Sequence, residues 1–144
     1  MSEVMEASLY QSVILDRSRN PRFRRRLAGP ALLHGKCTNP LCGDEAAIEL
    51  RLDAGGQIDD IGFTAEGCAI SLAACDLMAE AARGLAPAEA LALGSAFESM
   101  LGGGPDITDS TLLCFAPLRG YPSRRRCGTL PWQALATALG SEVT

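Results

Sequence analysis

A pair of alternating segments joined by a glycine turn places the strongest constraint on the fold of this chain. Residues 46–53 and residues 58–65 each alternate between apolar and polar side chains, as strands with one buried face do. The sequence Ala-Gly-Gly-Gln between them is typical of a turn. The two segments therefore predict an antiparallel hairpin, whose apolar face must be covered by another layer of the protein.

Helical periodicity dominates the rest of the chain. Apolar residues spaced three and four apart predict helices over residues 6–19, from near Cys68 to Arg83, from Pro87 to Leu101, and from about Gly128 to Leu139. In the last helix, Pro131 falls in the first turn, where a missing N–H group is tolerated. We also expect a short strand near residues 31–36 and a short helix or turn within residues 111–118.

Because the strands come early and the helices late, the pattern predicts the α+β class. We expect a small antiparallel sheet of about three strands packed against four to six helices. The length of 144 residues fits a single domain spanning residues 1–144. At 47% hydrophobic residues, such a domain can bury a core without help from disulfides.

Composition and charge exclude several classes of protein. No apolar run approaches the roughly 20 residues that a membrane helix needs, and the N-terminal segment lacks the pattern of a secretory signal. We therefore expect a cytoplasmic protein without a membrane partner, whose cysteines are reduced. A formal net charge of −4 argues against nucleic acid as a partner, because phosphate contacts require a basic face.

The positive charge is nonetheless concentrated in two clusters of arginines. The first cluster is Arg22, Arg24, Arg25 and Arg26, and the second is Arg124, Arg125 and Arg126. Such clusters are typical either of a solvated face or of a docking surface for an acidic partner or an anionic group. The sequence leaves both interpretations open.

Three of the six cysteines and one aspartate are placed where they can meet. Cys42 precedes the hairpin and Cys68 follows it, so closing the hairpin brings the two residues together. A bend at Gly43 can direct Cys42 and Asp44 toward one point. Cys68 and Cys127 are both predicted at helix N-termini, where free N–H groups stabilise a thiolate. Thiolates and a carboxylate suit a tetrahedral zinc site or a labile iron–sulfur cluster, with burial of inert thiols as the alternative.

The remaining candidates fit this site less well. Cys75 is two helical turns beyond the start of its helix, about 10 Å along the axis, which is too far to share one metal ion. Cys114 lies in an apolar stretch, and for both thiols we favour packing in the core. Cys37 lies in a loop five residues before Cys42, and we expect it to be buried or idle rather than a spare thiol of the site. His34 is not favoured as a ligand.

Three short motifs in the chain resemble those of a known family. The cysteine motifs of the IscU/NifU-type iron–sulfur assembly proteins are similar to residues 39–44 (Asn-Pro-Leu-Cys-Gly-Asp), 66–71 (Glu-Gly-Cys-Ala-Ile-Ser) and 124–130 (Arg-Arg-Arg-Cys-Gly-Thr-Leu). Residues 9–21 also resemble the first helix of that family. Arg126, which stands where IscU proteins carry a histidine, and the long segment from Gly102 to Tyr121 both resemble the SufU branch.

The resemblance implies an IscU/SufU-like fold and a metal site. SufU-type proteins bind Zn²⁺ through three cysteines and an aspartate, and the matching residues here are Cys42, Asp44, Cys68 and Cys127. Iron or a [2Fe–2S] cluster is the alternative occupant. Arg124 matches a family position near the metal, where contact with Asp44 is a reasonable role for it.

The resemblance also implies a function. Cys42 is the expected acceptor of persulfide sulfur from a SufS-like cysteine desulfurase, and the sulfur then passes to downstream iron–sulfur assembly proteins. Such a chain is a sulfurtransferase rather than a conventional enzyme. The alternative is a scaffold on which a nascent [2Fe–2S] cluster is built at the same residues. A purely structural zinc is less favoured, because a domain with two hydrophobic helices is expected to survive chelation.

The chain departs from the family pattern at two places. Residues 16–18 read Asp-Arg-Ser where the first-helix motif usually continues Asp-His-Tyr, and Pro131 replaces a serine-like residue. Neither change touches the four ligand positions. We therefore expect these departures to bear on partner specificity rather than on metal binding.

Overall fold

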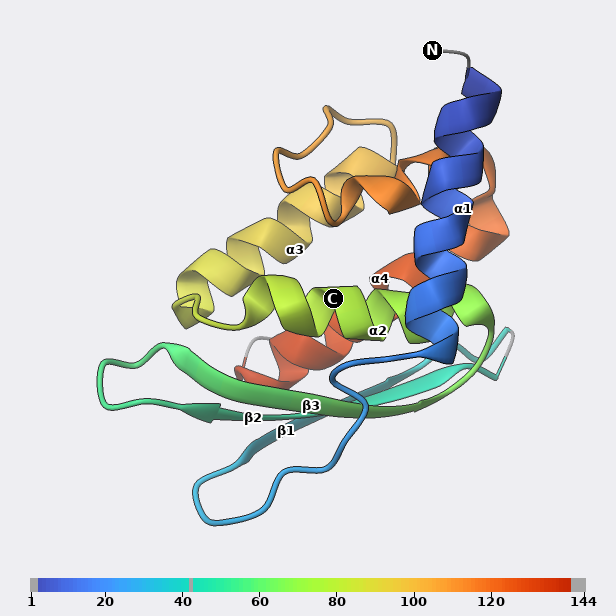
Figure 1. Cartoon of the computed structure of the whole chain (residues 1–144). Helices are drawn as coiled ribbons and strands as arrows, with labels where there is room; N and C mark the ends of the chain where they lie inside the picture. The colour runs from blue at the N-terminus through green and yellow to red at the C-terminus, as the bar shows by residue number, and fades with distance from the viewer. Residues whose placement is uncertain (1–2, 42, 141–144) are drawn as a thin grey trace.

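A three-stranded antiparallel sheet forms one layer of the molecule, and the helices pack on one of its faces (Figure 1). The computed structural model describes residues 3–41 and 43–140. The strand order is β1-β2-β3, with β1 at Leu33–Thr38, β2 at Glu45–Leu52 and β3 at Ile58–Glu66. The predicted hairpin is confirmed as β2 and β3, and the expected third strand forms β1, which pairs with β2.

Within the described residues, five helices complete the predicted α+β fold: α1 (Glu3–Arg19), α2 (Ala69–Ala82), α3 (Pro87–Leu101), the 3₁₀ helix η1 (Leu113–Gly120) and α4 (Pro122–Ala138). Figure 1 shows α2 lying across the sheet, with α3 and η1 farther from it. The ring of Phe97 lies 5.8 Å from the rings of both Phe115 and Trp132, which joins α3, η1 and α4 in one core. Among the described residues, no helix is both long and apolar enough to cross a membrane.

Gly35 allows α4 to approach the sheet closely. A Cβ atom built at Gly35 would lie 2.0 Å from the carbonyl oxygen of Ala134 and 2.5 Å from the backbone nitrogen of Ala138. Real Cβ atoms do not tolerate such contacts, so only glycine permits this packing. The contact between β1 and α4 fixes the helix that carries Cys127 relative to the sheet.

The start of α4 differs from the prediction. The helix begins at Pro122 instead of about Gly128, because proline is favourable at the first helical position and the arginines that follow are good helix formers. Pro131 therefore lies inside the helix, and its predicted place in the first turn is wrong. Since Pro131 has no N–H group, it cannot donate the usual hydrogen bond to the carbonyl of Cys127.

A buried ion pair ties α1 to α2. Arg17 and Asp76 are 6% and 0% exposed, and the guanidinium Nη1 lies 2.7 Å from the Asp76 carboxylate. The same carboxylate accepts hydrogen bonds from the backbone N–H groups of Arg22 and Phe23, at 2.7 and 2.8 Å. Arg17, where the first-helix motif departs from the family pattern, therefore ties α1 to α2, and Asp76 holds the segment that follows α1.

The first arginine cluster packs along β3. Arg25 forms an ion pair of 2.6 Å with Asp60, and Arg24 donates a hydrogen bond of 3.1 Å to the carbonyl of Ala65. The backbone N–H of Phe63 donates to the carbonyl of Phe23 at 3.0 Å. These contacts give the first cluster a role in holding the chain against its own sheet.

Candidate metal centre

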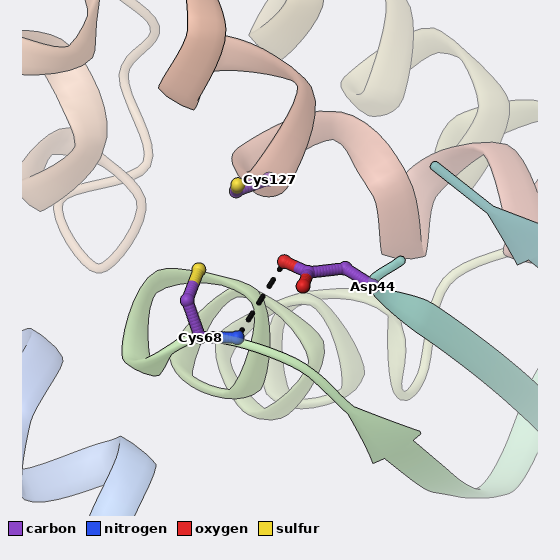
Figure 2. A group of neighbouring side chains, drawn as sticks. All are labelled: Asp44, Cys68 and Cys127. Carbon is purple, nitrogen blue, oxygen red and sulfur yellow. Dashed lines mark hydrogen bonds between the residues drawn. The ribbon is translucent and has the colours of Figure 1, made fainter. Parts of the chain in front are cut away.

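Two thiols and one carboxylate converge where three segments of the chain meet. Asp44 comes directly before β2, Cys68 caps the N-terminus of α2, and Cys127 lies in α4. A ligand atom from each residue lies within 4.8 Å of those from the other two. Figure 2 shows the sulfur atoms and the carboxylate pointing into the same space. Three of the four ligands predicted from the sequence are therefore brought together.

The fourth predicted ligand, Cys42, lies outside the residues that the structure describes. Its described neighbours in the sequence belong to a tight turn. The backbone N–H of Asn39 donates to the carbonyl of Asp44, and the N–H of Gly43 donates to the carbonyl of Asn39, both at 2.8 Å. Gly43 has a φ of +76°, which glycine adopts without strain. The place of Cys42 in the site stays a prediction.

The carboxylate of Asp44 is held from two sides. Asp44 is only 6% exposed, and its Oδ2 accepts a hydrogen bond of 2.6 Å from the hydroxyl of Ser71. The same oxygen lies 3.5 Å from the backbone nitrogen of Cys68, at the start of α2. A Cβ atom at Gly67 would lie 2.7 Å from Cγ of Asp44, so the carboxylate rests directly on the glycine backbone.

The two thiols have different environments. Cys68 is exposed at the helix cap, whereas Cys127 is 6% exposed. Burial, followed by the neighbouring Cys68 thiol, raises the pKa of the Cys127 thiol to about 12, even though the Ser71 side chain acts to lower it. The predicted placement of Cys127 at a helix N-terminus is wrong, because α4 already begins at Pro122. Without a cation beside it, this thiol stays protonated at neutral pH.

The donor set fits a tetrahedral metal site. Zn²⁺ binds thiolate sulfur at about 2.3 Å, so two sulfur ligands on one zinc ion stand about 3.8 Å apart. The spacing of up to 4.8 Å between ligand atoms requires only a small closing movement to reach that geometry. Sulfur and carboxylate ligands without histidine suit zinc or iron bound to sulfur better than magnesium or calcium.

Arg124 is exposed in the first turn of α4 and lines a hollow beside the site. This hollow has a volume of about 530 Å³, and its walls include Tyr10, Ala69 and Tyr121. The hydroxyl of Ser71 donates a side-chain hydrogen bond to Asp44. A role for Arg124 near the metal stays a prediction.

The structure separates the other cysteines from the site. Cys75 and Cys114 are buried in the core, as expected, and burial raises the pKa of Cys114 to about 12 and that of Cys75 further still. Cys37 is half-buried on β1, where its thiol lies 3.2 Å from the side-chain oxygen of Gln133. His34 is exposed and lies 3.5 Å from Glu49.

Two residues of the site, Ser71 and Gly67, have no predicted role from the sequence. Ser71 ends the second motif and lies three residues after Cys68, on the same face of the helix; these are the signals that could have identified it. Gly67 is readily interpreted as the residue that ends a strand. Its contact with Asp44 depends on a residue 23 positions earlier in the sequence.

Comparisons with known proteins point to one family. The model of the family described as NifU-like N terminal domain matches residues 9–139. The chain is 34% identical to the iron–sulfur cluster assembly scaffold protein IscU of Streptococcus pyogenes serotype M1, over 91% of this chain and 82% of the relative. It is 33% identical to the zinc-dependent sulfurtransferase SufU of Bacillus subtilis, over 94% of this chain and 92% of the relative.

Solved structures give the same result. A putative iron–sulfur cluster assembly scaffold protein for the SUF system from Fervidobacterium islandicum AW-1 aligns with a TM-score of 0.83 and 31% identity, over 96% of this chain and 99% of that one. A NifU-like protein from Brucella abortus aligns over its N-terminal part with a TM-score of 0.82 and 25% identity, covering 96% of each chain. The expected IscU/SufU-like fold is therefore confirmed.

Proposed function

Because this chain belongs to the NifU-like N-terminal domain family, we propose that it acts in iron–sulfur cluster assembly as a zinc-dependent sulfur-transfer protein. The observation that carries the proposal is the convergence of Asp44, Cys68 and Cys127 within 4.8 Å, at positions that match the three motifs of the family. The relative from Bacillus subtilis is named a zinc-dependent sulfurtransferase, which supports the choice of metal and of activity.

The side chains of the site have two proposed roles: some are metal ligands only, and one is also the nucleophile. Asp44, Cys68 and Cys127 would hold a zinc ion together with Cys42. When bound, zinc supplies positive charge that keeps thiols deprotonated near neutral pH. This charge is what the Cys127 thiol needs, because burial raises its pKa to about 12. Cys42, which falls between β1 and β2 in the sequence, is the acceptor in the proposed reaction.

The proposed transfer needs no external oxidant or reductant. The Cys42 thiolate attacks the outer sulfur of a persulfide on a cysteine desulfurase. A new S–S bond forms on Cys42 as the S–S bond of the donor breaks, and the donor cysteine leaves as a thiolate. The sulfur then moves by a second exchange to a downstream iron–sulfur assembly protein. We propose these two classes of protein as the partners of the chain.

The alternative function is a scaffold that holds a nascent [2Fe–2S] cluster at the same residues. The names of the Streptococcus and Fervidobacterium relatives support it. Two observations favour transfer. Arg126 replaces the histidine that IscU proteins carry before the third cysteine, and the SufU-like segment before Tyr121 is present, folded as a loop and η1.

Metal analysis and intact-mass spectrometry test the proposal. We expect about one zinc per chain after aerobic purification, since one tetrahedral site is proposed. We also expect a mass increase of about 32 Da, one sulfur atom, after incubation with a cysteine desulfurase and cysteine. Cys42→Ala should abolish the mass increase, and the control Cys37→Ala should retain it. A full mass increase on Cys42→Ala would exclude Cys42 as the acceptor, whereas two irons and two sulfides per anaerobically purified chain would favour the scaffold.

A further inference from the structure

A buried serine lies beneath the proposed metal ligands. Ser71 is in the first turn of α2, and its residue is 0% exposed. Its hydroxyl oxygen lies 2.6 Å from Oδ2 of Asp44 and 3.6 Å from Sγ of Cys68. The Ser71 side chain is also a neighbour of the Cys127 thiol. One hydroxyl group thus touches all three described ligands.

The hydroxyl can serve only one of these neighbours as a donor at a time. A serine hydroxyl carries a single proton, and a carboxylate can only accept hydrogen bonds. At 2.6 Å, the contact with Asp44 is in the range of short, charge-assisted hydrogen bonds. Serine inside a helix more often bonds a carbonyl of the preceding turn or faces solvent. Here the proton is committed to Asp44, 27 residues away in the sequence.

The backbone of Gly67 supports the same carboxylate. A Cβ atom at this position would lie 3.0 Å from each carboxylate oxygen of Asp44 and 2.7 Å from its Cγ. Asp44 therefore rests against Gly67 and is held by Ser71 at once. A carboxylate restrained by packing and by a hydrogen bond loses little freedom when it binds a metal ion, and this restraint increases metal affinity.

We propose that Ser71 is a positioning residue of the metal centre, which fixes the Asp44 carboxylate toward Cys68 and Cys127 without itself binding the metal. This inference rests on the proposed zinc site. Its consequence is that Ser71 sets the metal affinity through Asp44 alone. Removing the hydroxyl should therefore matter only while Asp44 is present.

Zinc affinity, measured by competition with a chromogenic chelator, tests this proposal in a double-mutant cycle. We expect Ser71→Ala to weaken zinc binding about 10- to 100-fold, as loss of a partner behind a ligand typically does. In the Asp44→Ala background, the same change should alter the affinity less than about twofold, because independent sites are additive and coupled sites are not. The control Ser95→Ala, at an exposed position of α3, should bind zinc like the unchanged chain.

The cycle separates positioning from a general structural role. Alanine favours helices, so Ser71→Ala is expected to fold, and far-ultraviolet circular dichroism of the metal-free protein checks this. Unchanged affinity of Ser71→Ala, or an equal loss with and without Asp44, would overturn the role of Ser71 while leaving the zinc site intact. Absence of zinc binding by the unchanged chain would overturn the site and the role of Ser71 together.

Discussion

Replacing Gly67 with alanine is expected to damage the metal centre while sparing the fold. The added Cβ would lie 2.7 Å from Cγ of Asp44, whereas carbon atoms in contact prefer about 3.5–4.0 Å. The carboxylate must therefore move by about 1 Å. A shift of that size along the hydrogen bond would lengthen the 2.6 Å contact with Ser71 beyond the range of a hydrogen bond.

The size of the effect follows from this displacement. Loss of the orientation of one ligand typically costs 10- to 100-fold in metal affinity, or about 1.4–2.8 kcal/mol. The free energy of unfolding of the metal-free protein should change by less than about 1 kcal/mol. Gly67 is exposed and has no positive φ, so alanine meets no backbone strain there. The loss in affinity should therefore exceed the loss in stability.

Chelator competition measures the zinc affinity, and urea denaturation of the metal-free protein measures the stability. Gly120→Ala is the matched control, because a Cβ at Gly120 meets no atom within 4 Å and its φ is not positive either. The control should leave both quantities near those of the unchanged chain. If Gly67→Ala binds zinc as tightly as Gly120→Ala does, the carboxylate does not need its present position and the reasoning is refuted.

Three further outcomes are expected. Asp76→Ala should lower the free energy of unfolding by about 2–4 kcal/mol in urea denaturation, because two backbone N–H groups lose their acceptor and buried Arg17 keeps Glu80 but loses Asp76; a loss below about 1 kcal/mol would contradict this. Zinc removal by a chelator should leave the far-ultraviolet circular dichroism and a cooperative thermal transition in place, because the core is packed without the site's ligands; loss of the transition would indicate a structural metal. In the native, metal-free chain, peptide mapping after brief alkylation should find Cys68 labelled well before Cys75 and Cys114, which are buried; equal rates would count against the burial described.

Local patterns were sufficient to predict most of the fold. The alternation on both sides of the glycine turn has the period of a strand, so the hairpin of β2 and β3 follows directly. The start of α4 was missed because its first turns carry arginines and no apolar stripe. In that region the helix is indicated by Pro122 at its first position, a weaker signal than periodicity.

Local sequence patterns also predict some residues of the candidate site and not others. The convergence of Asp44 and Cys68 follows from the hairpin, because closing it brings its two ends together. For Cys127, the predicted position at a helix N-terminus is wrong, so its assignment depends on its motif, since no local pattern relates α4 to the hairpin. The parts played by Ser71 and Gly67 are properties of three-dimensional contact with Asp44. Both residues fall within the second motif, but neither their spacing nor their residue type indicates contact with Asp44.

The segment at Phe23 and Arg24, which pairs with β3, protects one edge of the sheet from pairing with the sheet of another molecule. Unpaired strand edges invite association with a second chain. At β3, the backbone of Phe23 and the guanidinium of Arg24 occupy two hydrogen-bonding positions of the outer edge. Within the described residues, β1 pairs only with β2, and its exposed side chains include the charged Lys36. Charged side chains on an edge strand oppose pairing, so one edge is capped by the chain itself and the other is guarded by charge. The arginine-rich segment, residues 22–26, therefore opposes edge-to-edge association of the sheet in addition to holding the chain against β3.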